Sequence, residues 1–132
     1  MKATVDTNVL VRAVVEDDRK QATAAARFLR NAELIAVSLP CLCELVWVLR
    51  SVYDFGREEI AETVEALLDA KNVVVNRPAA DAGLAVLRAG GDFADGAIAW
   101  EGRWLGGDTF VSFDRKAVAR MKELGEAATA LG

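Results

Sequence analysis

The stretch ATVDTNVLVRAVVED at residues 3–17 decides the fold class. Alternating β-branched residues in its first part indicate a strand that ends at Asp6, and apolar residues then recur at helical spacing from Val9 to Val14. The chain therefore begins with a strand that leads into a helix, and the carboxylate of Asp6 stands at the junction.

The same alternation continues along the chain. Short apolar runs predict further strands at 34–38, 73–75 and 109–112, the first of them suited to burial on both faces. Helices are predicted at 19–31, 41–53 and 57–70, between Pro78 and Gly90, and at 92–104 and 115–124. Strands separated by helices predict an α/β fold with a mainly parallel sheet and helices on both faces. The tail from Gly125 shows no obvious closing strand.

Composition limits the possible functions. A chain of 132 residues with 53% hydrophobic content predicts a single domain, residues 1–132, with a sizeable core. No uncharged apolar run approaches the roughly 18 residues of a membrane span, so we expect a cytoplasmic protein without an anchor. There is no histidine, and Cys41 and Cys43 would point to opposite faces of a predicted helix. They therefore indicate small core residues in a reducing compartment, neither a disulfide nor a zinc pair.

Four carboxylates are predicted to converge. Asp6 and Asp114 each follow a strand, and the carboxyl ends of parallel strands form the edge of the sheet where ligands bind. Glu44 and Asp95 lie within about a turn of their predicted helix starts on that same edge. The net charge is −4, from 16 basic and 20 acidic residues, so these four carboxylates account for the whole acidic excess.

Each carboxylate also has a purely structural interpretation. Asp6, Asp92 and Asp114 all precede predicted helices, where aspartate is a common N-cap. With Asp92 as the cap, Asp95 sits at the third helical position, where the helix dipole favours an acid. Glu44 could face solvent or pair with Arg50. However, CLCELVWVL carries no other charge, and an ionised carboxylate in apolar surroundings is costly unless it is paired or bound to metal. We therefore expect Glu44 to have a partner.

The ligand chemistry indicates a particular kind of metal. Hard carboxylate oxygens without histidine or thiolate select Mg²⁺ or Mn²⁺ over zinc. Such ions bridge to phosphates and activate water, so the set suits hydrolysis of phosphodiester bonds. Bound metal would also offset the negative net charge, which otherwise disfavours a polyanionic substrate.

Four acidic motifs recur along the chain: DTNVL at 6–10, the lone Glu44, DFADGAIA at 92–99 and SFDRKA at 112–117. In order and approximate spacing, they resemble the motifs of PIN-domain ribonucleases, more narrowly those of VapC-type toxins of toxin–antitoxin pairs. The resemblance implies a PIN-like three-layer α/β/α sandwich. It also implies metal-dependent endonucleolytic cleavage of RNA, inhibition of translation, a homodimer and a cognate antitoxin that blocks the site.

Carried over by position, the resemblance assigns roles to individual residues. Asp6 and Asp95 would be the principal ligands of Mg²⁺ or Mn²⁺, and Glu44 and Asp114 would complete the acidic pocket. The supporting residues would be Asn8 and Ser112, with Asp92 secondary.

Residues around the acidic motifs carry further expectations. Candidate RNA contacts are Arg12, Arg115, Lys116 and Arg120. The tryptophans, Trp47, Trp100 and Trp104, are expected in the core or at a dimer interface. Gly96 stands where the family pattern leads us to expect alanine, and it should loosen its helix. Ser112 replaces the threonine often found there and keeps the hydroxyl.

Two non-catalytic interpretations are alternatives to a nuclease. A receiver-like Mg²⁺-binding module also gathers acids at the carboxyl edge of a parallel sheet, but it needs paired acids at the first strand and a lysine after the last. Here the first strand ends in Asp6-Thr7-Asn8, and TFVSFDR at 109–115 offers no such lysine. A PIN-like domain that has lost turnover, with Gly96 as its cause, would act only through protein partners.

Overall fold

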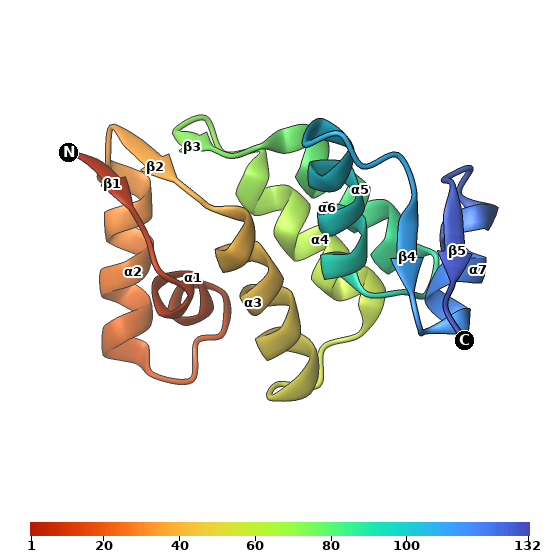
Figure 1. Cartoon of the computed structure of the whole chain (residues 1–132). Coiled ribbons are helices and arrows are strands. Elements are labelled where there is room, and N and C mark those ends of the chain that lie inside the picture. Colours follow the sequence, from red (N-terminus) through yellow and green to blue (C-terminus); the bar gives the residue numbers. More distant parts are fainter. The chain divides into compact units, whose positions relative to one another are not determined.

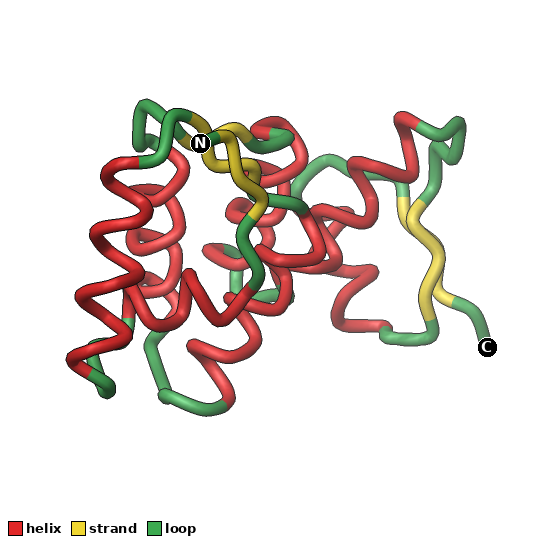
Figure 2. The backbone as a smooth tube through the Cα atoms, turned by 90° about the vertical axis from the view of Figure 1, so that its left-hand side faces the viewer, coloured by secondary structure: helices red, strands yellow, loops and turns green.

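Every strand pair in the structure is parallel. The computed structural model describes residues 1–132, which form two compact units, Met1–Asn76 and Arg77–Gly132 (Figure 1). Figure 2 shows the strands as short segments between longer helices. Each unit is described by itself.

The first unit contains a three-stranded sheet in the order β1-β2-β3. Its elements are β1 (Lys2–Thr4), α1 (Thr7–Val14), α2 (Arg19–Asn31), β2 (Leu34–Ala36), α3 (Leu39–Ser51), α4 (Arg57–Leu68) and β3 (Val73–Val74). Ile35 lies opposite Ala3 on one side and Val73 on the other, and its side chain is completely buried. The middle strand therefore anchors the sheet.

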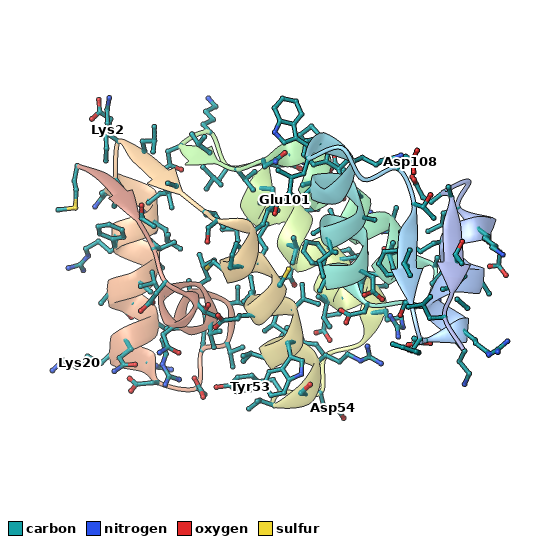
Figure 3. The ribbon with its side chains drawn as sticks, viewed as in Figure 1. Lys2, Lys20, Tyr53, Asp54, Glu101 and Asp108 are labelled. Atoms are coloured by element: carbon teal, nitrogen blue, oxygen red, sulfur yellow. The ribbon has the colours of Figure 1, made fainter.

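Side-chain caps fix where the helices of this unit begin. Asp18 accepts a hydrogen bond from the Gln21 amide, and Ser38 does the same for Cys41. Each cap satisfies an amide that the first turn leaves without a partner. After α3 the chain reverses through Asp54, whose φ of 57° lies in the left-handed region (Figure 3). These turns set the path from each helix to the next element.

The second unit pairs two strands in parallel. Its elements are α5 (Arg77–Arg88), α6 (Phe93–Trp104), β4 (Phe110–Ser112), α7 (Arg115–Glu123) and β5 (Ala128–Ala130). A buried cluster of Val86, Val118, Met121 and Ala128 joins α5, α7 and β5. The small side chains of β5 thus find a place against α7, which the tail sequence did not reveal.

Gly96 lets α6 lie directly against α5. A Cβ atom there would lie 2.3 Å from the carbonyl oxygen of Ala82 and 2.8 Å from the Cα of Gly83. The absent side chain is what permits the close contact between the two helices, a packing role that the sequence did not show. The expectation that Gly96 loosens its helix stays a prediction. Gly83 meets Phe93 in the same way.

The predicted fold class is confirmed. The alternation of strands and helices is that of an α/β protein, and it is consistent with the expected three-layer PIN-like sandwich. The order of elements is as predicted, with ends that differ by one to a few residues. The strand at Ala128–Ala130 is the element that the sequence did not show. None of the helices has the length and apolar character needed to cross a membrane.

We predict that Gly96→Ala destabilises the protein by about 1–3 kcal/mol, because the added methyl group forces α5 and α6 apart. Gly102→Ala is the matched control on the same helix, since no atom lies within 4 Å of its added Cβ. It should be neutral or stabilising by up to about 1 kcal/mol, because alanine favours helix. Urea unfolding of both variants checks this, and equal effects would contradict the packing role of Gly96.

Candidate functional site

Asp6 stands where β1 ends and α1 begins. Its Oδ1 accepts a hydrogen bond of 3.1 Å from the Val9 amide, so the carboxylate caps α1. The side chain is exposed, and its Oδ2 has no hydrogen-bond partner. The capping interpretation is thus confirmed, and one oxygen stays available for another contact.

Glu44 lies on the exposed side of α3. The buried residues of this helix are Cys41, Leu42, Leu45, Val46 and Leu49. The helical turn therefore places Glu44 away from its apolar sequence neighbours. The expectation that Glu44 has apolar surroundings is wrong, because its apolar neighbours in sequence lie on the buried side of the helix and Glu44 does not.

The partner of Glu44 is a hydroxyl group and not the guanidinium of Arg50. Thr7 Oγ1 donates a hydrogen bond to Glu44 Oε2 at 3.2 Å. Thr7 is the residue after Asp6, so this bond holds Glu44 beside the first turn of α1. Sequence reasoning missed Thr7, although a hydroxyl directly after an aspartate at a strand end was a usable signal.

The thiol of Cys41 lies near both predicted site carboxylates of this unit. Burial raises its pKa, a hydrogen bond from Thr7 opposes the rise, and the negative charges of Glu44 and Asp6 add to it. Since both carboxylates act on one buried thiol, the structure brings Asp6 and Glu44 to the same end of the unit.

The second unit gathers three further acids. Asp92 caps α6 through a 3.1 Å bond from the Ala94 amide to Oδ1, and Asp95 lies in the first turn of that helix. Asp114 caps α7, its Oδ1 accepting from the amides of Lys116 and Ala117 at 3.0 and 3.1 Å. The three predicted aspartates of this half of the chain are therefore all at helix N-termini.

Asp95 has an unfavourable electrostatic environment for an ionised carboxylate. Its side chain is half-buried, and burial is the main cause that raises its pKa, followed by the negative charges of Asp92 and Asp114. Arg120 provides a smaller opposing effect. These three acids are thus close enough to repel one another, with too little positive charge among them.

The predicted supporting residues have different surroundings. The Ser112 hydroxyl accepts a 3.0 Å hydrogen bond from the Asp114 amide and so fixes the turn that presents this aspartate. Asn8 lines a hollow of about 650 Å³ together with Asp6, Arg12 and residues of α2. The proposed support of the acidic pocket by Asn8 stays a prediction.

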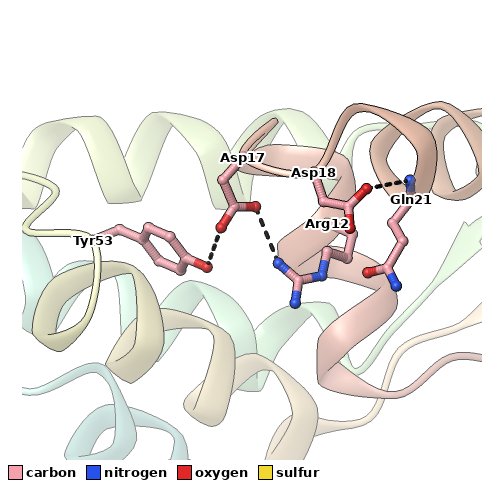
Figure 4. Close-up of polar contacts among 5 residues, drawn as sticks. All are labelled: Arg12, Asp17, Asp18, Gln21 and Tyr53. Atoms are coloured by element: carbon pink, nitrogen blue, oxygen red, sulfur yellow. Dashed lines mark hydrogen bonds and ion pairs between the residues drawn. The ribbon is translucent and has the colours of Figure 1, made fainter.

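Two of the basic residues expected to contact RNA have partners within the protein. Arg12 forms a 3.0 Å ion pair with Asp17, whose other oxygen accepts a 2.9 Å hydrogen bond from the Tyr53 hydroxyl (Figure 4). Arg115 donates to the carbonyl of Gly132 at 2.6 Å. Lys116 is exposed on the first turn of α7. Contact of these residues with RNA stays a prediction.

Arg120, another of the expected RNA contacts, packs against the end of α5. It is half-buried, and its Nε donates to the carbonyl of Ala89 at 3.3 Å. A Cβ on Gly91 would lie 2.6 Å from the Arg120 Cδ, so the glycine makes room for this arginine. Arg120 is therefore the counter-charge of Asp95 and a link between α7 and the end of α5.

The tryptophans are not core residues. Trp47 is 63% exposed and Trp104 is 78% exposed. Trp100 is half-buried and stacks on Trp104, with ring centroids 6.4 Å apart. The core expectation is wrong for Trp47 and Trp104, while the dimer-interface expectation stays a prediction.

The donor set fits a hard divalent cation in its chemistry. In neither unit do three histidine, cysteine, aspartate or glutamate side chains lie together as a ready metal site. The carboxylates are nevertheless of the kind that Mg²⁺ and Mn²⁺ prefer, and Asp95 lacks sufficient positive charge nearby. The expected convergence of Asp6 and Glu44 with Asp95 and Asp114 stays a prediction, because the two pairs belong to different units.

Comparison with known proteins identifies a family. Residues 3–124 match the family model described as PIN domain. No curated protein matches the chain. PIN domains are usually nucleases and typically use divalent metal ions.

We predict that Asp17→Asn destabilises the protein at pH 7. The hydrogen bond from Tyr53 is the main cause that lowers the pKa of Asp17, with a further contribution from Arg12. A carboxylate whose folded pKa is lowered stabilises above its unfolded pKa, near 3.8, and loses that effect as pH falls through the folded pKa. The difference in urea midpoint between wild type and variant should therefore be constant above about pH 5 and shrink below pH 3.8. Glu16→Gln is the control beside it, and an equal loss there would contradict the role of this contact.

Proposed function

Because the chain belongs to the PIN-domain family, we propose that it is a metal-dependent endoribonuclease and the toxin of a toxin–antitoxin pair. Residues 1–132 would form one PIN-like domain whose activity depends on Asp6, Glu44, Asp95 and Asp114. It includes a cytoplasmic location, a homodimer and a cognate antitoxin that covers the acidic residues.

The observation that carries the proposal is that each capping aspartate uses only one of its two carboxylate oxygens for the cap. Asp6, Asp92 and Asp114 each accept backbone hydrogen bonds through Oδ1 alone. Their Oδ2 atoms have no hydrogen-bond partner. A cap and a metal ligand are therefore compatible roles for one aspartate, since the cap fixes its orientation and leaves an oxygen free.

The four carboxylates would have different roles. Asp6 and Asp95 would hold Mg²⁺ or Mn²⁺, and Glu44 and Asp114 would complete the acidic pocket and orient the attacking water. When bound, the cation would lower the pKa of a water molecule and offset negative charge on the phosphate. Thr7 keeps Glu44 in position through its hydrogen bond, and Ser112 does the same for the Asp114 backbone.

The competing interpretations have lost support. Gly96 was the reason to consider a catalytically silent domain, and the close contact between α5 and α6 now explains that glycine. The match over residues 3–124 favours a PIN domain over a receiver-like module. We therefore keep the nuclease as the one proposed function.

We predict that purified protein free of antitoxin cleaves total cellular RNA into discrete fragments with Mg²⁺ or Mn²⁺ and not with chelator. Asp6→Asn and Asp95→Asn should each lower the rate by more than about 100-fold. Loss of a residue that only supports a metal ligand usually costs about 10–100-fold, and loss of the ligand itself should cost more. Asp108→Asn removes an exposed carboxylate before β4 and is the charge-matched control. Undiminished cleavage by Asp95→Asn, or none by folded wild type, would overturn the proposal.

A second prediction concerns Thr7. Thr7→Val keeps the shape but removes the hydrogen bond to Glu44, so kcat should fall about tenfold. Thr7→Ser keeps the hydroxyl and should restore most of the rate. Steady-state kinetics with thermal melting of all three proteins checks this, and equal rates for valine and serine would show that the hydroxyl has no such role.

A further inference from the structure

One face of α2 carries only positive charge. The helix contains Arg19, Lys20, Arg27 and Arg30 and no acidic residue. At about 100° per residue, these four positions fall within one arc of about 100°. All four are exposed, and Figure 3 shows Lys20 projecting away from the ribbon. We call these four residues the basic face of α2.

The cations of this face have no partners within the protein. None of the four side chains makes an ion pair or a hydrogen bond. Arg12, by contrast, is held by Asp17. In a chain whose net charge is −4, four unpaired cations on one helix are therefore a local exception to the overall charge.

The opposite face of α2 is committed to packing. Ala22 and Ala25 are buried, and Phe28 is half-buried. The helix is therefore fixed in the unit, and its basic face is a preformed surface.

This surface is continuous with the region around Asp6. Arg19, Lys20, Thr23, Ala24 and Arg27 line a shallow hollow of about 590 Å³. Ala24 also lines the larger hollow that contains Asp6. The two hollows therefore share one small side chain, which places the basic face beside the hollow that contains Asp6.

We propose that the basic face of α2 binds the phosphate backbone of single-stranded RNA and directs it across Ala24 toward Asp6. Arg19 and Arg30 are about 16 Å apart along the helix axis, which spans several phosphates. Contacts of this kind hold the backbone without reading the sequence. The inference rests on the proposed nuclease function for its substrate, and it adds the surface that recruits that substrate.

An anionic membrane fits this surface less well. A helix that lies on a bilayer needs large apolar side chains beside its cations. Here the flanking residues are Gln21, Ala24 and Ala26. Binding of an RNA backbone needs only the positive charges, so RNA fits the composition of α2 better than a membrane does.

The test compares two doubly substituted proteins of equal charge. Lys20→Ala with Arg27→Ala removes half of the basic face, and alanine keeps its preference for helix. Lys71→Ala with Lys122→Ala is the control, with both substitutions at exposed positions outside α2. Binding of a fluorescein-labelled oligouridylate is measured in chelator, where no cleavage occurs, over a range of salt concentrations.

Loss of two phosphate contacts should lower affinity about tenfold at 0.15 M salt and reduce the slope of log K against log salt by about 1.4. The control should bind as wild type does. With Mg²⁺, the α2 variant should show a raised KM on long RNA and an unchanged rate on a small p-nitrophenyl phosphodiester of uridine, because its carboxylates are intact.

Other outcomes separate the two proposals. Equal binding by the α2 variant and its control would overturn the basic face as an RNA surface while leaving the nuclease intact. Salt-dependent RNA binding through α2, in a wild type that never cleaves, would support the surface and overturn the nuclease. Binding to phosphatidylserine vesicles, with none to oligouridylate, would overturn the inference in favour of a membrane.

Discussion

The N-terminal cap is the interaction on which the arrangement depends. Asp6, Asp92 and Asp114 each follow a strand or a turn and accept amide hydrogen bonds from the next helix through Oδ1. The cap stabilises the start of the helix, and the partial positive charge of that end favours the carboxylate. It also fixes the direction of the second oxygen. The same bond that begins a helix therefore presents a carboxylate oxygen for chemistry.

The rest of each acidic group is built around these caps. Thr7, in the first turn after Asp6, holds Glu44. Asp95 follows Asp92 by one helical turn and is half-buried, where Asp92 and Asp114 oppose its ionisation. Arg120 is shared with the Ala89 carbonyl and cannot fully compensate. Acids gathered with insufficient positive charge are what a hard divalent cation would stabilise, and this is the link between the fold and the proposed nuclease.

Much of this could be predicted from the sequence because its signals are local. Aspartates before helices and apolar runs between them gave the α/β class, the order of elements and the caps. The closing strand at 128–130 was missed because small residues in AATA carry no strand pattern, and only contact with Met121 and Val118 shows why they are ordered. The packing role of Gly96 is likewise a property of two helices together. For Glu44, the sequence suggested burial, but the helical turn places it outside. The convergence of acids from both units depends on how those units pair, so it stays a prediction.

The central claim is that Asp6 and Asp95 hold a divalent cation. The most direct measurement is titration of the purified protein with Mn²⁺ by calorimetry, on wild type, Asp6→Asn, Asp95→Asn and the control Asp108→Asn. The account predicts that wild type and the control bind Mn²⁺ alike and that each ligand variant loses most of the affinity. Equal affinity in all four proteins, or no binding to folded wild type, would contradict it.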